Sequence, residues 1–331
     1  MQRCSDGNQR ALSLLKPIYS SAYKPASGLF SGPPLVCLIL PSVLIAAMML
    51  RTDLTLLKSQ FAEELKTDHF YDDVTSRCLK EKGQQKGTAI LFAKEEGVFS
   101  GESVVVAASQ ILPQIEFLLQ VKEGQKFEAG TSLLQVQGKI GELLSLERTL
   151  LNFLGHASGV ATLTHRYVQA VGNPAIKVLA TRKTLPGLKD LELQAVVSGG
   201  GNIHRRSLSD GILFKDNHIA LLSEKELLLE ARKSRSPLHR VEIEVQNLTQ
   251  LNEVLLYAPD VIMLDNMSYD DMKKGIAMVR EKFGKSCALE ISGGVSLEKI
   301  GELAKLDVDY ISVGKITHSA PWLNLSMDFK T

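Results

Sequence analysis

The pattern of hydrophobic and polar positions divides the chain at the Gly-Asn-Pro turn of residues 172–174. After this turn, short runs rich in β-branched residues alternate with stretches whose apolar residues recur at helical spacing. Strands are predicted over 176–180, 212–214, 241–245, 261–264, 288–291 and 310–313, and helices over 188–197, 224–233, 248–257, 269–283 and 297–306. Strands that alternate with helices form parallel sheets, and six such strands within about 150 residues predict a closed or nearly closed α/β barrel.

Between residues 51 and 171 the pattern mixes helices with short strands, as in a separate α/β domain. Helices are predicted over 54–65, over 103–119 with a kink or break at Pro113, and over 140–170 with a break near Gly155 and Gly159. Strands are predicted over 88–92 and 97–99, a polar turn over 67–75, and a turn followed by a strand over 124–136. We therefore expect two domains, 51–171 and 172–331, and the C-terminal tail is a candidate to return to the first.

The first fifty residues form a leader that needs its own interpretation. Residues 34–50 are an uncharged apolar run of 17, the lower limit for a membrane span, and Pro41 interrupts it. A signal anchor and the core of a secretory signal are two readings of this run. We favour a third, an over-extended reading frame, because Met48 and Met49 stand just before the first amphipathic helix. On this interpretation the protein is cytoplasmic, with a membrane anchor through 34–50 as the open alternative.

The overall composition is that of a globular protein and excludes some classes of function. The formal net charge is +1, with 44% hydrophobic and 23% charged residues. A nearly neutral chain without an aromatic-lined basic face gives no case for nucleic-acid binding. The four cysteines are scattered without a CxxC pair, which argues against a disulfide framework and a zinc knuckle.

Against this neutral background, residues 181–219 concentrate cations around a triple glycine, Gly199 to Gly201. Arginine binds carboxylate or phosphate through two hydrogen bonds, and lysine adds a mobile charge. The segment therefore indicates a site for a small, multiply charged anion, with a solvated basic surface as the alternative. Its cations are Arg182, Lys183, Lys189, His204, Arg205, Arg206, Lys215 and His218.

Polar residues also recur where the predicted barrel strands end, which is where parallel barrels carry their active sites. Cations would bind an anionic acceptor and a leaving pyrophosphate, carboxylates would bind ribose hydroxyls or Mg²⁺, and Ser/Gly turns would expose backbone N–H groups to a phosphate. Glu242 and Glu244 share one face of their strand; only one need be catalytic, and the other can pair with a cation. Along the chain these strand-end residues are Thr181, Arg182, Lys183, Lys215, Glu244, Asp265, Ser292, Gly293, Gly294, Ser312 and Gly314. The series predicts a sugar-phosphate or nucleotide site.

From about residue 51 to residue 329 the chain resembles the quinolinate phosphoribosyltransferase family. The resemblance rests on nine segments in the family's order: DDVTS at 72–76, ERTLLNFLGHASGVAT at 147–162, TRKTLPGLK at 181–189, GGGNIHR at 199–205, DGILFKDNHI at 210–219, VEIEV at 241–245, VIMLDN at 261–266, ISGGVS at 291–296 and YISVGKITHSAP at 310–321. It implies a type II phosphoribosyltransferase fold, with an N-terminal α/β sandwich followed by an incomplete α/β barrel. It also implies a homodimer in which the sandwich of one subunit closes the barrel of the other.

The resemblance further implies an activity and assigns roles to matching positions. Quinolinate and phosphoribosyl pyrophosphate would react with Mg²⁺ as cofactor to give nicotinate mononucleotide, pyrophosphate and CO₂, a step of NAD biosynthesis. Lys183, Lys215, Glu244 and Asp265 would be the catalytic set, and Glu244 and Asp265 would hold the metal, indirectly. Quinolinate would be bound by Arg148 across the dimer interface and by Arg182, His204 and Arg205 beside Thr181, and the 5′-phosphate by the turns Ser292–Gly293–Gly294 and Ser312–Val313–Gly314.

Two departures from the family pattern leave substrate details open. Ile203 stands where the family usually carries Asn or Ser, and Gly155 and His156 replace a polar or basic pair. One alternative is a ModD-type protein, linked to molybdenum transport, although that type tends to depart from the KDNHI segment at 215–219. The other is a catalytically silent, membrane-tethered barrel, against which the intact set of charged residues argues.

Overall fold

The computed structural model describes residues 53–330, which divide into two compact units. One comprises residues 53–161 together with 321–330, and the other comprises Thr162–Ala320. The apolar run at 34–50 lies outside the described residues. Within residues 53–330, none of the helices combines the length and apolarity that crossing a membrane requires.

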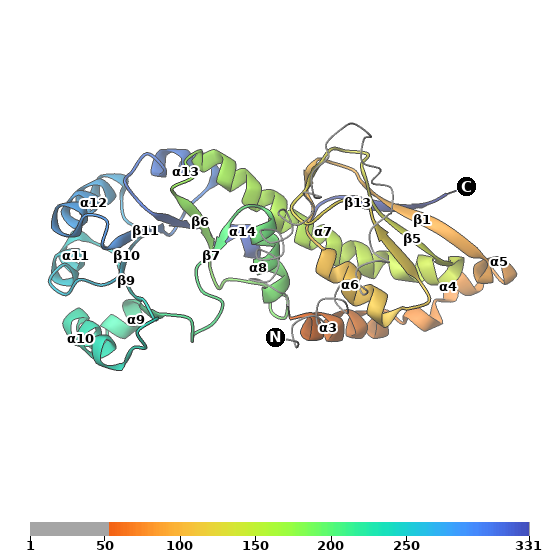
Figure 1. The fold of residues 1–331 in the computed structure, drawn as a ribbon, viewed down its shortest axis with the longest axis horizontal. Coiled ribbons are helices and arrows are strands. Elements are labelled where there is room, and N and C mark those ends of the chain that lie inside the picture. The colour runs from red at the N-terminus through yellow and green to blue at the C-terminus, as the bar shows by residue number, and fades with distance from the viewer. Residues whose placement is uncertain (1–52, 331) are drawn as a thin grey trace, which may run out of the picture. The chain divides into compact units, whose positions relative to one another are not determined.

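The first unit is built on a four-stranded antiparallel sheet of order β13-β1-β5-β3. The strands β13, β1 and β5 can be followed side by side in Figure 1. Alternate residues of β1, namely Ala89, Leu91 and Ala93, are fully buried, as are Phe61 of α3 and Leu134 of β5. The elements of this unit are α3 (Leu54–Thr67), η1 (Phe70–Asp72), α4 (Val74–Arg77), α5 (Glu81–Gln84), β1 (Lys86–Ala93), β2 (Gly97–Val98), α6 (Glu102–Ile111), β3 (Glu116–Leu119), β4 (Lys126–Phe127), β5 (Ser132–Lys139), the first part of α7 (Ile140–Val171) and β13 (Leu325–Phe329).

Two sequence-based expectations for this unit are wrong. The helix predicted over 103–119 ends at Ile111, and Glu116–Leu119 is a strand instead. Proline cannot continue the hydrogen-bonding ladder, so Pro113 ends the helix and the chain turns into the sheet. The break expected near Gly155 and Gly159 is absent, because α7 continues from Ile140 to Val171.

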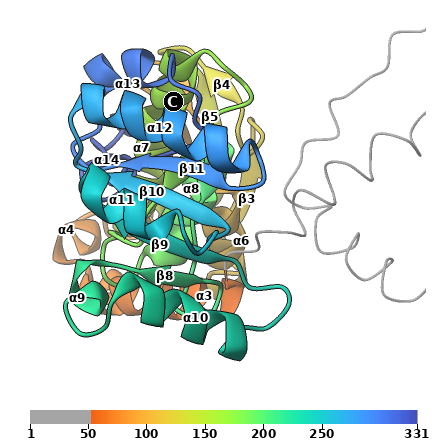
Figure 2. The same cartoon turned by 90° about the vertical axis from the view of Figure 1, so that its left-hand side faces the viewer.

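The second unit is a seven-stranded sheet of order β7-β6-β12-β11-β10-β9-β8, with every pair parallel. The helices α10, α11, α12 and α13 lie over one face of this sheet (Figure 2). Its two edge strands do not pair with each other, so the barrel is open, as the family resemblance implied, and not closed. Its elements are β6 (Lys177–Ala180), α8 (Lys189–Ser198), β7 (Asn202–Ile203), β8 (Ile212–Phe214), α9 (Asp216–Ile219), α10 (Glu224–Ser234), β9 (Val241–Val245), α11 (Leu248–Val254), β10 (Val261–Asp265), α12 (Tyr269–Phe283), β11 (Ala288–Ser292), α13 (Leu297–Leu303), β12 (Tyr310–Ser312) and α14 (Lys315–His318).

The register of the parallel strands decides which side chains share a face. Glu244 of β9 pairs with Met263 of β10, and Met263 pairs with Glu290 of β11. Since neighbours along a strand point to opposite faces, these three side chains share the face opposite Ile243 and Leu289. Ile243 and Leu289 are fully buried. The opposite face therefore carries the buried carboxylates Glu242, Glu244 and Glu290.

Ion pairs tie together the amino-terminal ends of the barrel strands. Arg280 of α12 donates to Asp309 Oδ2 at 2.7 Å and to Asp307 Oδ2 at 3.0 Å. Asp309 also accepts a hydrogen bond from the Leu289 N–H at 2.8 Å. Although burial alone would raise the pKa of Asp309, the hydrogen bonds from Arg280 and Leu289 outweigh it and lower the pKa below its usual value. These contacts join a helix to two adjacent strands and are structural.

Candidate active site

The first group of predicted site residues follows directly after β6. The Lys183 N–H donates to Thr181 Oγ1 at 3.2 Å, and Thr317 Oγ1 donates to the Lys183 carbonyl at 2.7 Å. A Cβ built on Gly314 would lie 3.4 Å from Lys183 Cδ. The lysine stem therefore runs beside the turn that follows β12, while Arg182 is exposed at the strand end.

Arg205 brings a second guanidinium near Arg182. Its Nη1 donates to the Gly211 carbonyl at 3.2 Å, which fixes it across the loop before β8. Burial is the main cause that lowers the pKa of Arg205, and the positive charge of Arg182 lowers it further. Arg182 therefore lies close enough for its charge to act on Arg205, and an anion bound near both would offset this repulsion.

Lys215 and Glu244 form an ion pair between the end of β8 and the carboxyl-terminal part of the next strand, β9. Lys215 Nζ lies 2.6 Å from Glu244 Oε2. The glutamate side chain is 7% exposed and the lysine side chain 44% exposed. The lysine thus keeps its ammonium accessible while it neutralises a buried carboxylate.

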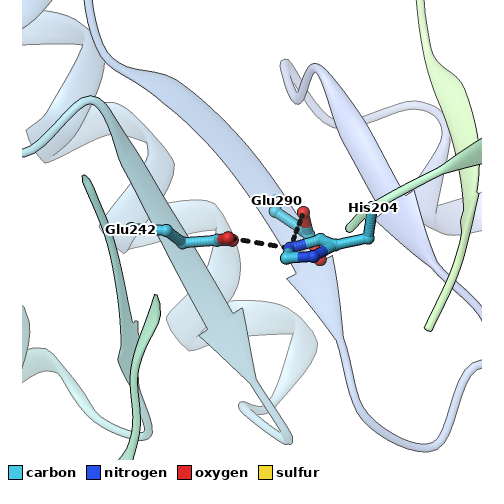
Figure 3. A group of neighbouring side chains, drawn as sticks. All are labelled: His204, Glu242 and Glu290. Carbon is cyan, nitrogen blue, oxygen red and sulfur yellow. Dashed lines mark ion pairs between the residues drawn. The ribbon is translucent and has the colours of Figure 1, made fainter. Parts of the chain in front are cut away.

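His204 is held by two buried carboxyl groups from different strands (Figure 3). Its Nε2 lies 2.7 Å from Glu242 Oε2 and 3.4 Å from Glu290 Oε2. Burial by itself lowers the pKa of His204, but the hydrogen bond that its ring donates to Glu242 and the charges of both glutamates outweigh it, so the pKa is raised. At neutral pH these contacts favour the charged imidazolium.

The Glu290 side chain is 1% exposed and lies at the inner end of this cluster. Burial raises its pKa most, and the charge of Glu242 raises it further, whereas His204 lowers it. Ser312 Oγ donates to Glu290 Oε1. Sequence reasoning missed Glu290 because the strand reads as an apolar run. The available signal was a single carboxylate sharing the face of Ser292, two residues on.

Asp265 and the glycines after β11 lie next to each other at adjacent strand ends. Asn266 Nδ2 donates to Asp265 Oδ2 at 2.7 Å, and the Asn266 N–H donates to the Ser292 carbonyl at 3.0 Å. A Cβ on Gly293 would fall 2.3 Å from Asn266 Oδ1, and Gly293 has a φ of +85°. Only glycine allows this close approach, so the turn is shaped around Asn266.

The turn after β12 contributes less polar surface than its sequence suggests. The Ser312 hydroxyl is turned to Glu290, and the Val313 N–H donates to the Leu179 carbonyl at 2.9 Å. Gly314 is the residue of this turn that lies beside Lys183.

The barrel therefore brings together the predicted residues of its own unit at the carboxyl ends of its strands. Arg148 belongs to the other unit, where it is an exposed residue of α7. A cavity of about 370 Å³ is lined by His204, Arg205, Glu242 and Glu290, and also by Lys177 and Tyr310. These last two begin β6 and β12, so the cavity extends from part of the candidate site toward the amino-terminal ends of the strands.

The chain is similar to known proteins over most of its length. The chain matches the model described as "Quinolinate phosphoribosyl transferase, C-terminal domain" over residues 160–328 and that of the N-terminal domain over residues 73–158. A nicotinate-nucleotide pyrophosphorylase [carboxylating] of Mycobacterium leprae is 37% identical over 259 residues, 77% of this chain and 90% of that protein. A relative from Methanocaldococcus jannaschii, named as a "Probable nicotinate-nucleotide pyrophosphorylase [carboxylating]", is 36% identical over 273 residues, 80% of this chain and 94% of that protein. The solved nicotinate-nucleotide pyrophosphorylase of Francisella tularensis superposes with a TM-score of 0.78 at 32% identity, covering 85% of this chain and 98% of that one.

Proposed function

The chain belongs to the quinolinate phosphoribosyltransferase family, and from this premise we propose the activity and the roles of its site residues. The protein converts quinolinate and phosphoribosyl pyrophosphate into nicotinate mononucleotide, pyrophosphate and CO₂. The observation that carries this proposal is the set of cations at the carboxyl ends of β6, β7 and β8, where the charge of Arg182 contributes to lowering the pKa of Arg205.

Quinolinate is a dianion, and burying it requires fixed cations that offset the loss of water. Arg182 and Arg205 supply two guanidinium groups, and His204 supplies a third positive charge held by Glu242 and Glu290. A planar acceptor with two adjacent carboxylates suits this arrangement better than nicotinate, which has one. The clamp therefore supports selection of the dicarboxylate.

The sugar substrate is proposed to lie along the remaining strand ends. Lys183 and Lys215 stand where negative charge builds up on the leaving pyrophosphate. Lys215 holds Glu244 and Asn266 holds Asp265 in place, and Glu244 is proposed to bind the ribose hydroxyls. The glycines after β11 and Gly314 after β12 leave backbone accessible to the 5′-phosphate.

The chemistry needs positioning more than covalent help from the protein. The pyridine nitrogen of quinolinate forms a bond to ribose C1 while the bond from C1 to the pyrophosphate oxygen breaks. The bond between C2 and its carboxylate then breaks, CO₂ leaves, and the electron pair stays on C2, where the adjacent pyridinium charge stabilises it until C2 takes up a proton. The fixed cations hold both substrates in line and stabilise the departing pyrophosphate.

We propose Mg²⁺ as the cofactor, bound mainly through the substrate diphosphate. Carboxylate oxygen is the ligand type that Mg²⁺ prefers, and Glu244 and Asp265 both offer it. Lys215 already neutralises Glu244, whereas Asp265 contacts the neutral amide of Asn266, so Asp265 fits the ion better. When bound, the ion would neutralise charge on the diphosphate.

A shared site in a homodimer is the further part of this proposal. Arg148 is exposed on α7 in the unit that does not contain the barrel. An exposed arginine of this kind is available to complete the acceptor site of a second copy.

The activity is tested by incubating the full chain with quinolinate, phosphoribosyl pyrophosphate and Mg²⁺. Nicotinate mononucleotide is followed by chromatography, and released CO₂ by carboxylate-labelled quinolinate. A parallel reaction contains nicotinate in place of quinolinate. Product from quinolinate alone is expected; product from nicotinate alone, or from neither with a folded protein, would contradict the proposal.

A further inference from the structure

We propose that Glu290 is a positioning residue for the acceptor: with Glu242 it holds the His204 ring by Nε2 in one orientation, so that Nδ1 is the atom presented to bound quinolinate. The inference rests on the proposed function and deepens it. It adds a residue from the inner face of the barrel, two positions before the turn after β11, to those that determine acceptor binding.

The geometry supports a His204 ring that is held at its Nε2 atom. Both carboxyl groups approach the same nitrogen, at 2.7 Å from Glu242 and 3.4 Å from Glu290, and the backbone N–H of His204 donates to the Ala180 carbonyl at 3.2 Å. Within residues 53–330, the other ring nitrogen, Nδ1, has no hydrogen-bond partner. When a carboxylate holds one nitrogen of an imidazole, the other is left for the ligand.

Glu290 is itself held in place on its other side. Ser312 Oγ donates to Oε1, which leaves Oε2 facing His204 and Glu242. Two carboxyl groups this close do not both stay ionised, and the raised pKa of Glu290 makes it the neutral partner. A neutral Glu290 can donate a hydrogen bond to the Glu242 carboxylate. Hydrogen bonds then link Ser312, Glu290, Glu242 and His204 in series.

The same three side chains could instead be ligands of a metal, since their ligand atoms lie within 4.8 Å of one another. We favour the hydrogen-bonded arrangement because the 2.7 Å contact is a normal charge-assisted hydrogen bond. A metal would also consume the nitrogen by which His204 is held and bury more positive charge beside Arg205. The two arrangements differ in metal content, which the experiment measures.

The test compares Glu290→Ala with Glu290→Gln in steady-state assays. Glutamine can accept from Ser312 and donate to Glu242 as a neutral glutamate does, so its quinolinate KM should stay within about threefold of wild type, whereas alanine should raise that KM by roughly tenfold or more. The KM for phosphoribosyl pyrophosphate should not change in either variant. Asp309→Asn is the matched control, since it removes a hydrogen-bonded carboxylate of the same sheet outside the site.

A double-mutant cycle decides whether Glu290 acts through His204. In a His204→Ala background, Glu290→Ala should have little further effect on the quinolinate KM; an undiminished effect would overturn the inference. Ser312→Ala, a smaller change, should raise the same KM in the same direction, and it serves if Glu290→Ala does not fold by circular dichroism. Equal changes in both substrates' KM values, or stoichiometric metal in the purified protein, would also overturn it. A wild-type protein that forms no nicotinate mononucleotide would instead contradict the proposed function.

Discussion

In the proposed function, Arg182 and Arg205 form an anion site from a single pair of side chains. Each guanidinium is permanently charged, and the lowered pKa of Arg205, caused by burial and then by Arg182, reports that the two repel. That repulsion is a cost of the free protein. A bound dicarboxylate removes it and adds charge-assisted hydrogen bonds, so each arginine should contribute strongly to binding the acceptor.

Arg182→Ala should therefore raise the KM for quinolinate by about 10- to 100-fold, the loss expected for one or two charged hydrogen bonds. Turnover should also fall, because a loosely held acceptor is misaligned with ribose C1. The measurement is steady-state kinetics with each substrate varied in turn. Lys225→Ala, an exposed cation on α10, is the control. Unchanged kinetics for Arg182→Ala would remove this residue from the clamp.

At the residue scale, the sequence indicated the exposed candidate residues better than the buried ones. The shared parity of Glu242 and Glu244 predicted one face, and each of them indeed pairs with a cation, His204 and Lys215. Glu290 could not be predicted in the same way. Its carboxyl is tolerated in an apolar strand only because Ser312, Glu242 and His204 meet it there, and those are contacts between distant segments.

At the scale of elements, α7 shows that a glycine can mark close packing rather than a helix end. A Cβ on Gly159 would lie 2.1 Å from the carbonyl oxygen of Pro321, and the Leu323 N–H donates to the Gly155 carbonyl at 2.9 Å. The returning C-terminal segment therefore lies directly on the helix. The sequence showed the glycines but not this neighbour, which is why a break was predicted.

Gly159→Ala should lower the free energy of unfolding by about 1–3 kcal/mol, the usual cost of forcing extra atoms into a packed contact. Gly141→Ala, in the first turn of the same helix, is the matched control. Its added Cβ would meet nothing closer than 3.4 Å, so the higher helix propensity of alanine should stabilise the protein by up to about 1 kcal/mol. Urea unfolding of both variants measures the difference. Equal effects would show that Pro321 does not crowd Gly159.

The contact of Arg280 with Asp309 gives the barrel a pH dependence at its amino-terminal end. The pKa of Asp309 is lowered in the folded state, so its ionised carboxylate stabilises the fold at pH values above its usual pKa of 3.8. This stabilisation is lost as the pH falls through the lowered pKa. Asp309→Asn should lower the free energy of unfolding by about 1–2 kcal/mol at pH 7. The difference in unfolding free energy between this variant and wild type should become smaller as the pH drops below about 4.

Thermal and urea unfolding between pH 7 and pH 3 would test this dependence on Asp309. Glu281→Gln, at an exposed carboxylate near the end of α12, is the control and should follow wild type throughout. If the difference in unfolding free energy between Asp309→Asn and wild type is unchanged at low pH, the lost stability comes from altered packing rather than from the charge.

Between residues 103 and 119 the sequence identified a break but not the type of structure that follows it. Pro113 was recognised as a helix breaker, yet 116–119 is too short for a period of two to be distinguished from a period of 3.6. Its strand pairing with β5, from Glu116↔Gln137 to Leu119↔Leu134, is a long-range contact. The two-residue strand β7 was missed for the same reason, whereas the six longer barrel strands were predicted because each alternates with an amphipathic helix.

At the scale of the whole molecule, the residues of the proposed site are divided between two units. Arg148 belongs to the unit built on the antiparallel sheet, and the other site residues belong to Thr162–Ala320. A site shared between subunits needs residues from two different units. The shared site can therefore be tested through the assembly of two variants rather than through any single contact. Arg148→Ala and Lys215→Ala should each be nearly inactive when assayed alone, because each removes a cation from every site.

Mixing the two inactive variants should restore activity if Arg148 serves the partner's barrel. In a mixed dimer, the barrel with an intact Lys215 would receive an intact Arg148 from the other subunit, so that one of its two sites works. Random exchange would give about a quarter of wild-type activity, since half of the dimers are mixed. If Arg148 serves its own barrel, both sites of the mixed dimer lack one cation. Native mass spectrometry that shows mixed dimers without activity would therefore overturn the shared site while leaving the reaction itself intact.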